Sequence, residues 1–350
     1  MTTIFVQPSP WQRVRHVLQG FDAMLLATIA ALAAIGLVAM YSAGYDHGTR
    51  FVDHGRNMLI ALVVIVVVAQ VPPHKMERLA VPLYTIGLVL LLAVALFGIT
   101  RKGATRWLNV GIVIQPSEIM KIAMPLMLAW WFQKREAQLR AVDYLVALAL
   151  LAVPVALVMR QPDLGTSLLV LASGLFVIFF AGLSWRIVLP LLLLAGTGIV
   201  ALVLAQETLC DSGMRWPVLR EYQQHRVCTL LDPARDPLGK GFHILQGMIA
   251  IGSGGLGGRG FMQGTQTHLE FIPERTTDFI FAAFCEEFGF IGVLVLLVAF
   301  SVLILRGLAI AADAPTVFSR LLAGAVTMGF FTYAFVNMGM VSGILPVVGV

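Results

Sequence analysis

The sequence has little charge and few cysteines. Asp, Glu, Lys and Arg make up 12% of its 350 residues, about half the share that is usual in a soluble domain. So few charged side chains cannot cover a water-facing surface, which excludes an ordinary soluble protein. The three cysteines show no spacing typical of a zinc site. The net charge of +5 comes without a cluster of basic and aromatic residues, so we expect no nucleic-acid partner.

Long apolar runs dominate what is present, since 59% of the residues are hydrophobic. A membrane-spanning helix needs about 20 mostly apolar residues. By this criterion the sequence predicts an all-α, polytopic helical membrane bundle. The nine predicted spans are 22–42, 56–71, 79–99, 117–132, 143–159, 164–184, 186–205, 279–304 and 318–341.

The distribution of Lys and Arg predicts the orientation. Cytoplasmic loops are enriched in these residues, and the bias favours an N-terminus inside, with residues 1–20 cytoplasmic. The one large loop, 206–278, then lies outside. Three cations in 101–106 oppose the bias, which points to an anionic ligand at the outer face. The glycines of 252–260 formally contain GxGxxG, but no strand precedes them, so a turn or re-entrant backbone is the better reading.

Two cysteines share the large loop. Cys210 and Cys228 would face a compartment in which disulfides can persist. A disulfide between them is one hypothesis, and two free buried thiols are the alternative.

Ionisable residues in or near the spans are candidate functional residues. Ser117 is a candidate N-cap of the fourth span, which places Glu118 in the first helical turn and Lys121 on the same face. One interpretation is a cap and an internal ion pair. The other is that Lys121 binds an anionic ligand.

Two aspartates lie where apolar segments begin. Asp163 is a candidate N-cap of the sixth span, and ligand binding is the alternative. Asp278 lies where the long loop enters the eighth span, and it is either an N-cap or a carboxylate base at the mouth of an outer cavity. The adjacent Glu286 and Glu287 are expected to pair with groups on other helices. By themselves these patterns fit an enzyme or a transporter that handles a lipid-linked anion.

Four stretches resemble the SEDS family (shape, elongation, division and sporulation proteins), and within it the RodA-like branch. They include Asp236-Pro237-Leu238-Gly239, Gly264-Thr265-Gln266 and Pro273 through Glu287, and the likeness runs from about residue 20 onward. The matching stretches are Arg101 to Ala123, Gln161 to Thr166, Tyr222 to Arg226, and Asp232 to Gly292.

The resemblance implies a peptidoglycan glycosyltransferase of the bacterial inner membrane. Such enzymes polymerise lipid II into β-1,4 glycan at the periplasmic face, release undecaprenyl diphosphate, and work with a class B penicillin-binding protein. The family's essential aspartate falls on Asp278, the expected base. Its cavity positions fall on Arg106, Glu118, Lys121 and Asp163, and Arg101 would add positive charge. No cofactor is evident, no metal cage is recognisable, and a divalent cation is left open.

Two further functions stay open, a lipid II flippase and a non-catalytic scaffold for the penicillin-binding protein. The family usually has ten spans, and a Pro- and Gly-rich loop precedes the tenth. This sequence ends at Gly343–Val350, where that loop would begin. The nine predicted spans agree with a missing last span.

Overall fold

A computed structural model describes most of the chain. The described residues are 20–46, 48–101, 104–109, 111, 113–161, 163–211, 221–236, 239–272 and 274–345. The predicted cytoplasmic segment 1–20 lies outside them except for Gly20, and so do the last five residues, 346–350.

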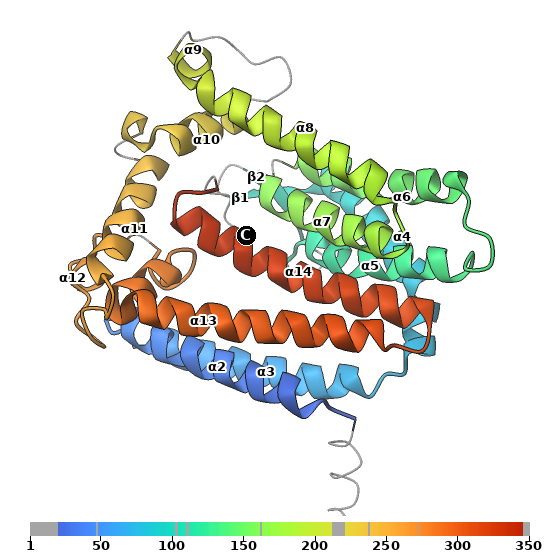
Figure 1. The fold of residues 1–350 in the computed structure, drawn as a ribbon, viewed down its shortest axis with the longest axis horizontal. Helices are drawn as coiled ribbons and strands as arrows, with labels where there is room; N and C mark the ends of the chain where they lie inside the picture. The colour runs from blue at the N-terminus through green and yellow to red at the C-terminus, as the bar shows by residue number, and fades with distance from the viewer. Residues whose placement is uncertain are drawn as a thin grey trace, which may run out of the picture.

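The described residues form a polytopic helical bundle, as predicted, and each predicted span overlaps one long helix (Figure 1). Seven of these helices are long and apolar enough to cross a membrane, α7 is a shorter apolar helix, and α5 belongs to neither group. The count of nine spans therefore stays a prediction. Several helices begin a few residues before the apolar run that predicted them, because their first turns, such as that of α3, contain charged residues. The helices are α2 (Ala23–Ala43), α3 (Arg50–Ala69), α4 (Pro73–Phe97), α5 (Pro116–Gln133), α6 (Ala141–Arg160), α7 (Leu164–Phe180), α8 (Trp185–Leu204), α13 (Ile280–Ala312) and α14 (Val317–Val341).

Shorter elements fill the connections. A small antiparallel sheet between α4 and α5, which the sequence did not predict, has the strand order β1-β2-β3. The elements of the long loop lie together at one end of the bundle (Figure 1), called the loop end below. The short elements are β1 (Ile99–Arg101), β2 (Ala104–Asn109), β3 (Val113–Ile114), α9 (Gln206–Asp211), α10 (Glu221–Leu231), η1 (Pro233–Arg235), α11 (Lys240–Gly254) and α12 (Thr265–His268).

The main core lies where α4, α5, α6, α7 and α14 meet. Its largest fully buried side chains include Leu91, Met124, Phe132 and Phe318. By contrast, α3 and α8 contain no buried residue at all. The bundle therefore has a packed centre and two helices whose apolar side chains are available to lipid.

The backbone of α13 is broken at Gly289, where φ is 62° and ψ is −162°. A helix break inside a membrane must have its freed polar groups satisfied. The glycine-rich segment 255–260 supplies the partners. Its carbonyls accept from the amides of Phe290 (2.9 Å) and Ile291 (3.1 Å), and its amides donate to carbonyls of the preceding turn at 2.9 and 3.0 Å. The predicted turn is thus confirmed for 255–260, whereas residues 252–254 belong to the end of α11 (Lys240–Gly254). This part of the long loop packs alongside α13.

Candidate functional site

Asp163 is the centre of a buried polar cluster. It is the N-cap of α7, where its Oδ1 accepts from the amide of Thr166 at 3.2 Å. The same carboxylate lies 3.6 Å from Nη1 of Arg106, which β2 carries, and accepts from Nε2 of Gln115 at 3.0 Å. Its side chain is only 2% exposed. The predicted cap is confirmed, and the cap also holds a cation at this position.

The first turn of α5 differs from the prediction. Its N-cap is Gln115 and not Ser117, because Pro116 takes the first helical position, where a missing N–H costs nothing. Ser117 is buried within the turn, and its Oγ accepts from Nε2 of Gln115 at 3.1 Å. Gln115 therefore joins α5 to the Asp163 cluster.

Glu118 and Lys121 form the predicted ion pair on one face of α5, with 2.7 Å between Nζ and Oε2. The Lys121 side chain is 16% exposed and that of Glu118 is 54% exposed. The ammonium also lies 5.1 Å from the ring centroid of Tyr333 on α14, within the range of a cation–π contact. Lys121 is thus held between a carboxylate and an aromatic ring.

This ion pair lies at the loop end of a long apolar cavity of about 910 Å³, called the Lys121 groove. The wall formed by α14 runs from Phe318 to Tyr333, which is roughly 20 Å at 1.5 Å per residue. The other walls come from the far end of α3 and from α4, α5 and α7, and nearly all of their lining side chains are apolar. The groove has the shape and chemistry to hold a hydrocarbon chain whose charged end reaches Lys121.

A second cavity of about 590 Å³ lies on the other side of Tyr333, between α2, α3, α13 and α14. It is called the Asn337 groove. Its lining is apolar apart from Asn337 and Tyr333, and it reaches the first residue of α13, Ile280. Two apolar cavities therefore share one wall on α14.

Asp278 lies in a turn, 274–279, directly before α13. The N-cap of that helix is Phe279, whose carbonyl accepts from the amides of Ala282 and Ala283. The cap thus lies one residue after the position that the sequence suggested. The main-chain oxygen of Asp278 accepts from Nδ2 of Asn337 at 3.4 Å.

The two polar parts of the site meet the same helix. Asn337 contacts Asp278, and Tyr333 contacts Lys121. Residues four apart lie one above the other on a helix surface, one turn or about 6 Å apart. One face of α14 therefore brings the Asp278 turn and the Glu118–Lys121 pair to neighbouring levels at the loop end.

Arg101 ends β1, where it pairs with Ala104 of β2. Its side chain lies outside what the structure describes, and so does Lys102. Of the predicted outer basic cluster, Arg106 is the member whose side chain is described.

Glu286 and Glu287 pair with uncharged groups on other elements. Glu286 accepts from main-chain amides of α12, and Glu287 accepts from the hydroxyl of Ser42 on α2. Both side chains are buried. Pairing across elements was predicted, but no sequence pattern indicated that the partners would be amides and hydroxyls.

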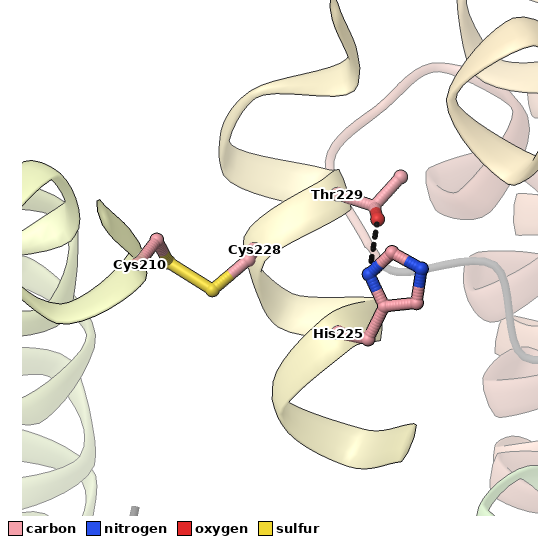
Figure 2. Close-up of a disulfide and its surroundings, with 4 residues drawn as sticks. All are labelled: Cys210, His225, Cys228 and Thr229. Carbon is pink, nitrogen blue, oxygen red and sulfur yellow. Dashed lines mark hydrogen bonds between the residues drawn. A yellow bond between two sulfur atoms is a disulfide. The ribbon is translucent and has the colours of Figure 1, made fainter. Parts of the chain in front are cut away.

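Cys210 and Cys228 form a disulfide that joins α9 to α10 (Figure 2). Their Cα atoms are 5.9 Å apart. The disulfide hypothesis is confirmed, and the alternative of two free thiols is wrong. Cys285 is a free, buried cysteine of α13.

Similarity to known proteins covers almost the whole chain. The family model described as "Cell cycle protein", for FtsW, RodA and SpoVE, matches residues 22–350. The chain is 48% identical to peptidoglycan glycosyltransferase MrdB of Escherichia coli (strain K12), over 93% of this chain and 85% of MrdB. It is 32% identical to stage V sporulation protein E of Bacillus subtilis (strain 168), over 94% of this chain and 89% of that protein.

Two solved structures share the fold. RodA of Thermus thermophilus superposes with a TM-score of 0.61 at 28% identity, over 94% of this chain and 87% of that one. The second structure is a chain of a peptidoglycan synthase complex and concerns the coordination of polymerization and crosslinking. It superposes with a TM-score of 0.73 at 33% identity, over 94% of this chain and 90% of that one. The resemblance inferred from the sequence motifs is confirmed, and this chain belongs to the FtsW, RodA and SpoVE family.

Proposed function

We propose that this chain is a peptidoglycan glycosyltransferase that polymerises lipid II into β-1,4 glycan strands for cell-wall elongation. The 48% identity to a peptidoglycan glycosyltransferase supports this activity. One structural observation carries the proposal. The Lys121 groove is long and apolar, and it ends at a lysine–glutamate pair one turn of α14 from the Asp278 turn.

The substrate fits this arrangement because it has an apolar and an anionic part. The polyprenyl chain would lie in the Lys121 groove, and its diphosphate would lie among Lys121, Arg106 and Arg101. Charge-assisted hydrogen bonds from such cations stabilise a leaving diphosphate as its charge develops. Glu118 and Asp163 would orient the two cations, as they do in the free protein.

In the proposed reaction, Asp278 is the general base. It takes the proton of the acceptor sugar's 4-hydroxyl while that oxygen attacks the anomeric carbon of the donor. The bond from this carbon to the diphosphate breaks, and undecaprenyl diphosphate leaves with the bonding electrons. A single displacement converts the α-linked donor into a β-1,4 product, as in inverting glycosidases, where a carboxylate also serves as the base.

A divalent cation is not given a step in this mechanism. In the described part of the chain, no group of three or more His, Cys, Asp or Glu residues is placed to hold a metal ion. Of the three carboxylates in the proposed site, Asp163 and Glu118 each already face a basic side chain, and Asp278 is assigned as the base. The chemistry proposed here therefore uses only groups of the protein.

The proposal includes a location and a partner. The protein is a multi-pass membrane protein, and we place its loop end and its active site at the periplasmic face of the inner membrane. The likeness to a chain of a peptidoglycan synthase complex supports a class B penicillin-binding protein as the partner, which would crosslink the strands that this chain makes.

A lipid II flippase is the alternative that one observation favours. Transporters often bind substrate at broken helices, and α13 is broken at Gly289. Here, however, segment 255–260 satisfies the amides that the break frees, so the break offers little to a substrate. The grooves and the ionisable residues at the loop end fit catalysis at one face better.

The first test is Asp278→Asn in the purified chain with its penicillin-binding protein, assayed for lipid II polymerisation. Asparagine keeps the size of the side chain but cannot accept the proton, so we expect polymer formation to fall at least a hundredfold. Asp143→Asn is the matched control, because Asp143 lies in the first turn of α6 at the opposite end of the bundle. It should keep its activity.

The outcomes separate the three functions. Loss of polymer at unchanged thermal stability supports the transferase with Asp278 as its base. Polymer formation by Asp278→Asn would remove this residue from the chemistry. If the unmutated complex makes no polymer but moves lipid II across vesicles, the flippase replaces the transferase. If it does neither and still binds the penicillin-binding protein, it is a scaffold.

A further inference from the structure

Arg275 is a buried cation three residues before Asp278, and its side chain is 7% exposed. Every nitrogen of its guanidinium has a partner. Nε donates to the carbonyl of Ala43 at 3.0 Å, and Nη1 donates to the carbonyl of Thr267 at 3.0 Å. Nη2 forms an ion pair with Asp46 and lies 3.8 Å from a carboxylate oxygen of Glu270.

These contacts join three separate elements. Ala43 and Asp46 lie at the loop end of α2, Thr267 belongs to α12, and Arg275 itself belongs to the turn 274–279 that carries Asp278. Two hydrogen bonds close this turn, from the amides of Thr277 and Phe279 to the carbonyl of Glu274. A shift of Arg275 would therefore move the whole turn.

The backbone beside Arg275 needs external support. Glu274 has φ of 50° and Glu270 has φ of 59°. This is a left-handed backbone conformation that residues other than glycine rarely adopt. Such conformations persist where surrounding contacts hold them, and they gather at functional sites. The guanidinium of Arg275 supplies those contacts on the side of the turn that faces α2.

The guanidinium also binds α12, through the carbonyl of Thr267. α12 is held in place because it is anchored to α13. The carboxylate of Glu286 is fully buried and accepts four hydrogen bonds from three consecutive residues. Two come from the amides of Gln266 (2.7 Å) and Thr267 (3.1 Å), and two from the hydroxyls of Thr267 (2.9 Å) and Thr265 (3.2 Å). α13 thus holds α12, α12 and α2 hold Arg275, and Arg275 holds the Asp278 turn.

We propose that Arg275 is a positioning residue for polymerisation, which fixes the Asp278 turn against α2 and α12 so that the carboxylate meets the acceptor hydroxyl. This inference rests on the proposed role of Asp278. A misplacement of about 1 Å can cost a reaction on the order of a hundredfold. Lysine cannot replace arginine here, because a single ammonium cannot reach two carbonyls and a carboxylate that lie around a planar fork.

The test is Arg275→Lys in the full chain with its penicillin-binding protein. We expect kcat for lipid II polymerisation to fall ten- to a hundredfold, while KM changes less than twofold, because the proposed contacts to the polyprenyl chain and the diphosphate lie outside the turn. Hydrogen exchange of the amides of 274–280, followed by mass spectrometry, should become at least tenfold faster.

Arg306→Lys is the matched control. Arg306 also pairs with an aspartate of the α2 region, with 2.6 Å between Nη2 and Oδ2 of Asp22, but at the opposite end of α13. This variant should lower the melting temperature without changing kcat or the exchange of 274–280 by more than twofold. A purely structural role for Arg275 would make the two variants alike.

The proposal is overturned if Arg275→Lys keeps kcat within twofold of the unmutated complex, or if kcat falls without faster exchange of 274–280. If Arg275→Lys does not assemble, Asp46→Asn is used instead, because it weakens the ion pair of the same guanidinium. An unchanged kcat in that variant overturns the proposal as well. Failure of the proposed function gives a different result. In that case Asp278→Asn still forms polymer, which rejects Asp278 as the base. Loss in Asp278→Asn with normal kcat in Arg275→Lys rejects the positioning role alone.

Discussion

Lys121 is the cation best placed to act on a substrate that occupies the Lys121 groove. Glu118 lies 2.7 Å from its ammonium, and the ring of Tyr333 covers another side. These contacts hold the ammonium in one place although its side chain is only 16% exposed. An arriving diphosphate would meet a cation that needs no reorganisation, which is the arrangement that favours electrostatic catalysis.

We therefore expect Lys121→Met to lower kcat for lipid II polymerisation roughly ten- to a hundredfold. A hydrogen bond to a charged group contributes about 1.5–3 kcal/mol, and each 1.36 kcal/mol corresponds to about a factor of ten in rate. Lys134→Met is the matched control, because Lys134 pairs with Glu77 at 3.2 Å at the opposite end of α5. Equal rates for the two variants would show that the ammonium of Lys121 has no part in the reaction.

The sequence predicted those site residues whose partners are close in the chain. Asp163 precedes an apolar run and was recognised as a cap, and Lys121 was paired with Glu118 because they are three residues apart. The partners of Arg275 and Glu286 were not predictable. Two partners of Arg275, Ala43 and Asp46, lie more than 200 positions earlier, and Glu286 binds main-chain amides that no side-chain pattern reveals.

The helices were predictable because the length of an apolar run is a strong signal for a membrane span. The break of α13 was not, since it depends on Gly289 meeting segment 255–260 from the long loop. The sheet β1-β2-β3 was missed because its strands are only 3, 6 and 2 residues long. Ser117 was misassigned as a cap because Pro116 takes the first helical position, which places the cap two residues earlier, at Gln115.

The disulfide matters most to α8. This helix has no buried residue, so few contacts with the rest of the bundle hold it in place. It leads directly into α9, which the bond between Cys210 and Cys228 ties to α10 (Figure 2). The covalent link therefore restrains the loop end of a helix that packing leaves loose.

We expect Cys228→Ser to lower the melting temperature of the purified protein. The two cysteines are 18 positions apart, and closing a loop of this size stabilises a protein by about 3 kcal/mol in the chain-entropy model. A reductant should lower the melting temperature of the unmutated protein to that of the variant, and should have no effect on the variant. An unmutated protein that melts at the same temperature with and without reductant would contradict this account.

α2 and α13 are tied together by polar contacts at both ends of the bundle, and they run side by side between them (Figure 1). At the loop end, Ser42 donates to the carboxylate of Glu287. At the other end, Asp22 caps α2 through the amide of Leu25 and pairs with Arg306. Apolar side chains, including those that line the Asn337 groove, lie between these two ties. The two ends should therefore respond separately to a change that affects only one of them.

The pair between Asp22 and Arg306 predicts a pH dependence. The guanidinium of Arg306, and then the amide of Leu25, lower the pKa of Asp22 from 3.8 to about 2. Because the folded-state pKa is the lower one, the stabilisation by this carboxylate is fully present above about pH 4 and is lost as the pH falls through about 2. The melting temperature should fall over this window, and less so in Asp22→Asn, which carries no titrating group there. Parallel curves for the two proteins would exclude Asp22 as a source of acid sensitivity. If the protection of the 274–280 amides, relative to their intrinsic exchange rate at each pH, stays unchanged over the same window, the contact at the loop end is independent of this pair.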